Sequence, residues 1–168
     1  RYNEETGNFD LYYQLPGENL EIICMHIYKG YLWMGTTTNG VYRLDIDKKE
    51  LTHPIKKGNI TSFYRDSEGE LWIGSWEEGL FHVKTDGKIE NFRYDAKNPH
   101  SLSSNFVRAC CEDNLGNIWI GTFNGLNRYN KSTGLFQNHT ANDIQTDGLT
   151  HSSIWCIVKD NQGTLWLG

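Results

Sequence analysis

A short motif with a tryptophan between two glycines recurs four times in this chain of 168 residues. Each copy reads Gly-x-x-Trp-x-Gly, and successive tryptophans are 39, 47 and 47 residues apart. The four tryptophans are Trp33, Trp72, Trp119 and Trp166. Repetition at such a period is typical of proteins built from stacked supersecondary units, each of which buries its apolar face against its neighbours. The chain is therefore predicted to be a repeat protein.

Each repeat is predicted to contain four short antiparallel strands. In the clearest copy an apolar stretch, residues 60–66, ends in an Asp-x-x-Gly turn, where aspartate bonds to nearby backbone and glycine supplies a positive φ. The strands expected after that turn span residues 71–75, 79–84 and 88–94. No stretch shows a 3.6-residue periodicity long enough for the helix that a leucine-rich or helical solenoid requires. Four strands per roughly 40–45 residues with a Gly-Trp signature are typical of a β-propeller blade.

The repeats predict an all-β propeller fragment of four-stranded antiparallel blades, with three full blades and two complementary half-blades. The expected boundaries are a half-blade at 1–18, blades at 19–57, 58–96 and 102–141, and a half-blade at 150–168. The first half-blade is recognised because residues 1–9 copy the pattern of residues 128–136. We expect an excerpt of a longer propeller. The half-blades could also pair with each other or between chains, as a homodimer or by half-blade exchange, which would cover open sheet edges.

Composition argues against several classes of function. The chain has 16 Lys and Arg against 21 Asp and Glu, so it lacks the basic footprint of a protein that contacts nucleic acid. No apolar run reaches the roughly 20 residues of a membrane helix, so a membrane is expected to be met only through regions outside this sequence. No nucleophile elbow, phosphate loop, dinucleotide fingerprint or zinc spacing is present. We therefore predict no enzymatic activity, cofactor or metal for this segment.

The four cysteines carry little information about function. Cys110 and Cys111 are adjacent, so a disulfide between them would need a strained geometry. Cys24 and Cys156 lie in apolar stretches and are expected to be small buried hydrophobic residues.

The best copy of the motif, residues 113–122 continuing to Phe136, resembles the two-component regulator propeller repeat. The stretch 98–105 is also similar to the linker of that family. The likeness weakens in the first copy, which lacks the aspartate, and in the second, where His82 and Val83 replace Arg-Tyr. The resemblance implies a periplasmic sensor region of a hybrid two-component regulator, with an attached histidine kinase elsewhere. It also implies that oligosaccharides released from glycans are the ligands.

Positions that repeat are expected to be structural. The four tryptophans are flanked by aliphatic residues and are predicted to pack between blades. The aspartates of the turns, Asp66, Asp113 and Asp160, are explained by bonding between side chain and backbone.

Positions that break the repeat are the candidate ligand contacts, because function is usually carried by variable loops on a rigid scaffold. Two residues after the motif glycine stand Thr37, Trp76 and Phe123, near the turn between the second and third strands. Trp76 precedes Glu77 and Glu78, and an aromatic ring beside carboxylates suits a sugar. Packing of Trp76 on the next blade is the equally open alternative.

A second set of candidates lies where the innermost strands begin. Thr61, Arg108 and Trp155 occupy equivalent places, five residues before the turn aspartate. Arg108 and Trp155 could contact a ligand near the central channel. Arg108 could instead pair with an acid such as Glu112, and Trp155 could be part of the core. A scaffold without a ligand of its own, or a propeller lyase, is the alternative to ligand sensing.

Overall fold

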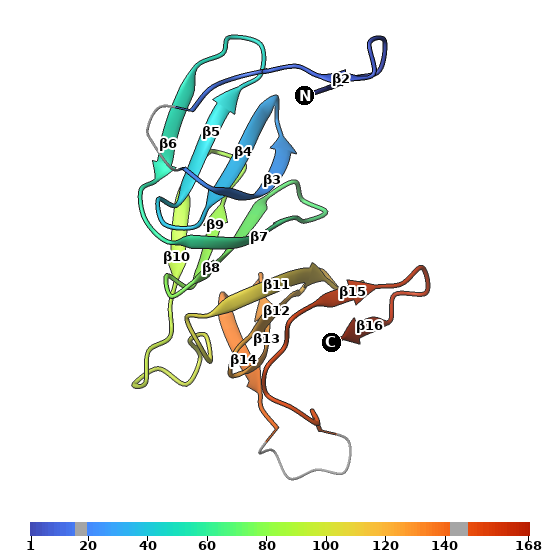
Figure 1. Cartoon of the computed structure of the whole chain (residues 1–168). Coiled ribbons are helices and arrows are strands. Elements are labelled where there is room, and N and C mark those ends of the chain that lie inside the picture. Colours follow the sequence, from blue (N-terminus) through green and yellow to red (C-terminus); the bar gives the residue numbers. More distant parts are fainter. Residues whose placement is uncertain (16–19, 142–147) are drawn as a thin grey trace.

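The computed structural model describes residues 1–15, 20–141 and 148–168, and all of its regular structure is β. Three four-stranded antiparallel sheets stand in a row between two two-stranded sheets (Figure 1). The described residues form no helix, so they contain none that could cross a membrane. The fold is therefore an all-β propeller fragment with three full blades and two half-blades, as the repeat predicts.

The strands of each sheet follow one another in sequence. The first half-blade is β1 (Tyr2–Asn3) and β2 (Asn8–Phe9). The three full blades are β3 (Ile22–Tyr28), β4 (Tyr31–Thr36), β5 (Val41–Asp45) and β6 (Leu51–Ile55); β7 (Asn59–Arg65), β8 (Leu71–Trp76), β9 (Leu80–Val83) and β10 (Ile89–Phe92); and β11 (Val107–Glu112), β12 (Ile118–Thr122), β13 (Gly125–Asn130) and β14 (Leu135–His139). The second half-blade is β15 (Ile157–Lys159) and β16 (Leu165–Leu167).

The first strands of the sheets, β3, β7, β11 and β15, lie next to one another and form the inner edge of the row (Figure 1). Each full blade begins with the same irregularity, a one-residue β-bulge near the start of the first strand. The extra residues are Ile23, Thr61 and Arg108. In the last half-blade the amides of Trp155 and Cys156 both donate to the carbonyl oxygen of Gly168, so Trp155 occupies the same place.

The glycine that follows each motif tryptophan is required by the close approach of the next blade. A Cβ on Gly121 would lie 2.8 Å from Cγ2 and 3.1 Å from the carbonyl oxygen of Ile154. A Cβ on Gly35 would lie 2.7 Å from Cγ2 of Ile60. These distances leave no room for a side chain, so the first strand of one blade packs directly on the second strand of the blade before it.

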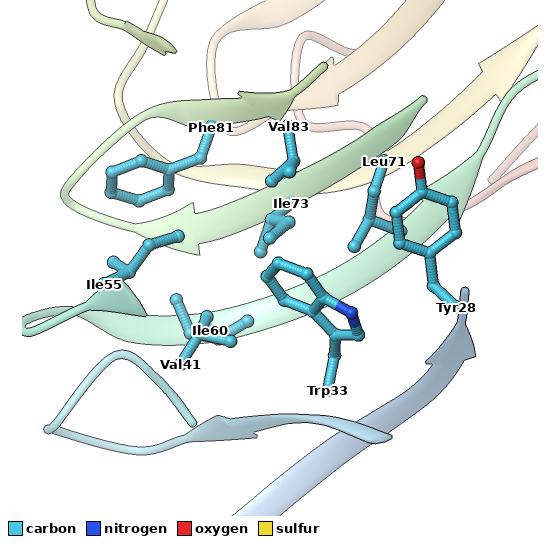
Figure 2. Close-up of a cluster of buried hydrophobic side chains, with 9 residues drawn as sticks. All are labelled: Tyr28, Trp33, Val41, Ile55, Ile60, Leu71, Ile73, Phe81 and Val83. Atoms are coloured by element: carbon cyan, nitrogen blue, oxygen red, sulfur yellow. The ribbon is translucent and has the colours of Figure 1, made fainter. Parts of the chain in front are cut away.

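The motif tryptophans pack between blades, as predicted. Figure 2 shows Trp33 of β4 facing Leu71 and Ile73 of β8, in a buried cluster drawn from both sheets. Trp72 lies in a corresponding cluster with Val107 and Ile118 of the next blade. Trp166 differs: it lies on the last sheet, where the described residues supply no further sheet to cover it, and it is 63% exposed.

The turn aspartates do more than bond to backbone. The carboxylate of Asp66 accepts hydrogen bonds from the amide of Glu70 (2.8 Å) and from the indole nitrogen of Trp72 (2.9 Å). Asp113 and Asp160 hold Trp119 and Trp166 in the same way, each at 2.8 Å. In the first blade, which lacks the aspartate, the buried indole nitrogen of Trp33 has no partner among the described residues. The aspartate therefore fixes the turn and orients the tryptophan that packs on the next blade.

The first half-blade reproduces the outer half of the third blade. Tyr2 pairs with Phe9 in the register in which Tyr129 pairs with Phe136. The two half-blades form separate sheets at opposite ends of the row and do not pair with each other (Figure 1).

The sequence also predicts that Cys24 and Cys156 are small buried residues. Cys24 is partly buried and packs against the cluster that contains Trp33, whereas Cys156 is exposed on the two-stranded sheet β15–β16, so burial was a wrong prediction for Cys156.

We expect Gly121→Ala to lower the free energy of unfolding by about 1–3 kcal/mol, because the new methyl group collides with Ile154. Ile154→Ala also destabilises the chain, because it removes buried apolar atoms. In a chain that already carries Gly121→Ala, however, it also removes Cγ2 of Ile154, with which the new methyl group collides. The double variant should therefore lose less stability than the two single variants together. Urea unfolding of all four proteins measures this coupling, and strict additivity would contradict the close approach.

Asp66→Asn is expected to cost about 1–3 kcal/mol at neutral pH, because an amide in place of the carboxylate sets a donor against the Trp72 indole or the Glu70 amide. Burial alone would raise the pKa of Asp66, but hydrogen bonds from Trp72 and Lys131 outweigh it and hold that pKa below its ordinary value. The ionised carboxylate therefore stabilises the fold above the unfolded-state pKa of about 3.9, and this contribution is lost as the pH falls through the folded-state pKa.

The difference in unfolding free energy between the parent and Asp66→Asn should thus narrow as the pH falls from 7 to 3. The control is Asp47→Asn, at an exposed aspartate, which should change little at any pH. A difference for Asp66→Asn that stays constant over this range would show that the carboxylate charge is not what stabilises the turn.

Candidate functional site

Antiparallel order brings three of the variable positions to one face of the sheet row. The end of β8, the start of β11 and the start of β15 all lie on that face, because alternate strands of a blade run in opposite directions. Trp76, Arg108 and Trp155 come from these three places, and the structure brings them together. Trp76 is partly buried, and Trp155 is 55% exposed. Trp155 therefore does not belong to the core, which corrects that alternative.

The guanidinium of Arg108 lies between the two indoles. Its Cζ is 4.2 Å from the centre of the Trp76 ring and 4.0 Å from the centre of the Trp155 ring. The Nε of Arg108 is buried without a hydrogen-bond partner, and no described carboxylate pairs with the side chain. Partial burial lowers the pKa of Arg108, because part of the guanidinium is shielded from water.

The alternative that pairs Arg108 with Glu112 is wrong. Glu112 is buried and accepts hydrogen bonds from the amide and hydroxyl of Ser67 at 2.7 and 2.9 Å. Its other partner is Lys131, whose Nζ lies 2.9 Å from Glu112 and 2.9 Å from Asp66. Glu112 thus joins the second and third blades on the side of the turn aspartates, away from the face that carries Arg108.

Aromatic rings surround Trp76 on the side of the third blade. Phe106 and Phe123 contact Trp76 with ring centroids 5.0 and 6.3 Å away, both edge-on. Trp76 and Phe106 also form an isolated antiparallel bridge, and the amide of Phe123 donates to the carbonyl oxygen of Phe106 at 3.0 Å. The alternative that Trp76 packs on the next blade is therefore correct for the side of its ring that meets Phe106 and Phe123. Phe123 itself is 52% exposed.

A pocket of about 360 Å³ opens on the other side of Trp76, between the first and second blades. It is lined by Thr37, Thr38, Gly58, Asn59, Trp76, Glu77 and Glu78. The turn that carries Trp76 is held in place because Ser75 donates its hydroxyl to the carbonyl oxygen of Gly79 at 2.8 Å. Glu77 within the turn has a φ of 91°, a left-handed conformation that is unusual for a side chain other than glycine.

The two glutamates next to Trp76 differ in their surroundings. Glu78 is paired with Lys57 at 2.8 Å and with Arg93 at 2.5 Å. The hydrogen bond from Lys57 and the charge of Arg93 hold the pKa of Glu78 below its ordinary value. Glu77 is exposed, and its carboxylate has no hydrogen bond or ion pair with the described residues. Glu77 is thus the carboxylate that remains available to a ligand at the pocket.

Sequence reasoning missed Phe106 and the pocket residues Thr38, Gly58 and Asn59. Phe106 stands two residues before Arg108, where the preceding blade has Asn59 and the last half-blade has Ser153. This position varies between repeats, as the other candidates do, and that variation was the available signal.

Comparison with known proteins agrees with this architecture. Residues 54–77, 101–124 and 148–168 match the two component regulator propeller model. No curated protein matches the chain. The chain is 19% identical to virginiamycin B lyase from Staphylococcus aureus, with a TM-score of 0.64 over 92% of this chain and 51% of the lyase. It is 14% identical to the computationally designed Ika4 protein, with a TM-score of 0.61 over 96% of this chain and 98% of that one.

A third similar structure is the extracellular domain of a Bacteroides thetaiotaomicron protein described as a hybrid two component system. The identity is 22% and the TM-score 0.45, over 99% of this chain and 29% of that domain. The chain thus spans less than a third of the length of that domain. Fold and repeat together define the class as a β-propeller of four-stranded antiparallel blades. Within that class, the chain carries the two-component regulator propeller repeat.

Arg108→Met is expected to change the free energy of unfolding by no more than about 1 kcal/mol, because only a stacking interaction with two rings is lost. The matched control is Lys131→Met, which leaves the buried carboxylates of Asp66 and Glu112 without their cation and should cost about 3–5 kcal/mol. Urea unfolding compares the two variants. An equally large loss for Arg108→Met would mean that Arg108 serves the fold and not a site.

Proposed function

We propose that this chain is the ligand-sensing propeller of a hybrid two-component regulator, placed outside the cytoplasm, and that it binds an oligosaccharide on the face that carries Trp76. The family of the repeat supports the regulator role. The observation that carries the binding role is the position of Trp76. Its ring lines the pocket that also contains the carboxylate of Glu77, which is unpaired among the described residues, and it contacts the guanidinium of Arg108.

The chemistry of the pocket suits a sugar. A volume of about 360 Å³ lies in the range of about 300–1,000 Å³ that is typical of small-molecule sites. An indole offers an apolar surface to the C–H face of a pyranose ring, and carboxylate, amide and hydroxyl groups orient sugar hydroxyls. Glu77, Asn59 and Thr37 supply those groups here.

Signalling would follow from a difference in affinity between two arrangements of the receptor. A ligand shifts an equilibrium only by as much as it binds one state better than the other. The site is built from elements of neighbouring blades, so a small change in the angle between those blades changes its geometry. We propose that oligosaccharide binding favours one arrangement of the blades, and that an attached histidine kinase responds to that arrangement.

A scaffold role is the second candidate, and the exposed apolar side chains at both ends of the sheet row favour it. On β3 these side chains are Ile23, Met25 and Ile27, and on β16 they are Trp166 and Leu167. In this role the half-blades of two copies complete each other: β1–β2 of one copy has the register of an outer half-blade, and it would add to β15–β16 of the other. The result would be a homodimer without a ligand of its own.

We expect Trp76→Ala to weaken oligosaccharide binding at least about tenfold, since loss of a central aromatic contact typically costs that much. Isothermal titration calorimetry with a panel of neutral and uronate-bearing oligosaccharides measures the effect. Tyr94→Ala removes an exposed aromatic side chain elsewhere and should leave the affinity unchanged. Equal affinity of the Trp76 variant and the parent would exclude this site. A panel without any ligand, together with a stable dimer in light scattering, would favour the scaffold role.

A further inference from the structure

Arg108 is a cation without a counter-charge among the described residues, whereas several cations of the neighbouring blades are paired. Lys131 has three carboxylates within 4 Å, and Lys57 and Arg93 share Glu78. Arg108, in contrast, donates no hydrogen bond to any residue that the structure describes, and its Nε is buried. The buried Nε is closed to a ligand, but Arg108 as a whole is only partly buried, so the terminal nitrogens of its guanidinium are open to an anion from outside the described residues.

The two indoles determine which part of the guanidinium is left for a partner. Trp76 and Trp155 lie over the guanidinium with their ring centres 4.2 and 4.0 Å from Cζ. Stacking of this kind uses the faces of the planar group, whereas its hydrogen bonds lie in the plane and point from its edge. The edge of the guanidinium therefore remains available. A planar anion with two oxygens matches that edge best, through two parallel hydrogen bonds.

Arg108 is the extra residue of the β-bulge at the start of β11, a place where the strand pairing does not dictate the side chain. Bulges change the direction of a side chain within a strand and are common next to functional sites. The same place in the other blades holds Ile23, Thr61 and Trp155. The fold therefore does not require an arginine at this place. It offers a position at the inner edge of each blade whose side chain is free to vary.

We propose that Arg108, held between Trp76 and Trp155, is the subsite for the carboxylate of an acidic sugar, so that the ligand class is a uronate-bearing oligosaccharide. This inference rests on the proposed function, since it names the ligand class of the same site. The carboxylate binds at the edge of Arg108, Trp155 supplies an exposed ring next to it, and the neighbouring sugar extends over Trp76 toward Glu77. Glu77 lines the pocket between the first and second blades, whereas Arg108 and Trp155 belong to the third blade and the last half-blade, so the ligand carboxylate and Glu77 occupy different ends of the site.

The test compares uronate oligosaccharides, their methyl esters and neutral oligosaccharides of the same length, by calorimetric titration of the whole chain. The esters keep the size of the ligand and lose its charge. We expect the acids to bind and the esters to bind at least about tenfold more weakly. Arg108→Met should weaken binding of the acid about 10- to 100-fold and leave binding of the ester unchanged. Arg108→Lys keeps the charge without the planar fork and should fall between the two.

Arg43→Met is the matched control. Arg43 also lies over two aromatic rings, Tyr31 at 4.6 Å and Trp33 at 5.5 Å, but its Nε donates to Thr52. The control should bind the acid as the parent does. Equal binding of acid and ester, or an Arg108→Met variant that binds the acid normally, would overturn the carboxylate subsite. If the chain binds only neutral oligosaccharides, and Trp76→Ala abolishes that binding, the carboxylate subsite is overturned but the proposed function is supported. If none of the oligosaccharides binds, both the carboxylate subsite and the proposed function are overturned.

Discussion

The structure depends on the contact between the motif glycine of one blade and the first strand of the next. A Cβ on Gly35 or Gly121 would lie less than 3 Å from Ile60 or Ile154 of the next blade, and a Cβ on Gly74 would lie 3.0 Å from Val107. This close approach lets the neighbouring tryptophan bury its ring between blades, and the turn aspartate holds that ring by its indole nitrogen. Apolar burial and a directed hydrogen bond thus act on the same side chain in the second and third blades, at Trp72 and Trp119.

The side chains of the candidate site stand where the repeat leaves freedom. The bulge at the start of each inner strand recurs in the full blades but carries different side chains. The turn after the second strand varies in backbone as well: Gly79 follows Gly74 by five residues, whereas Gly125 follows Gly121 by four. In the second and third blades and the last half-blade these positions hold Trp76, Arg108 and Trp155, which meet on one face. The site therefore belongs to the junction of three sheets, and any change in the angle between them alters it.

The sequence was sufficient to predict the blades, because glycine and tryptophan at fixed spacing leave few alternatives. It also singled out variable positions at Trp76, Arg108 and Trp155, whose side chains the structure brings together; their binding role stays a prediction. It could not show how they meet. Arg108 and Glu112 stand near opposite ends of β11, about 13 Å apart at the rise of an extended strand, and Glu112 is bound instead by Ser67 and Lys131. The hydrogen bond that the Trp72 indole donates to Asp66 was missed, because it joins the turn of a hairpin to the strand that follows and the Asp-x-x-Gly turn pattern does not indicate it. Exposure of Trp166 and Cys156 depends on what packs against β15–β16, which a local motif does not specify.

The central claim is that one guanidinium lies between indoles from two other sheets. NMR of the Arg108 side chain tests this claim directly, because a group stacked over aromatic rings experiences their ring currents. The account predicts that the Nε–H and δ-methylene protons of Arg108 resonate clearly upfield of the other arginines. They should move back toward ordinary values in Trp155→Ala and further in the double variant with Trp76→Ala. Ordinary chemical shifts that do not respond to loss of either indole would contradict the account.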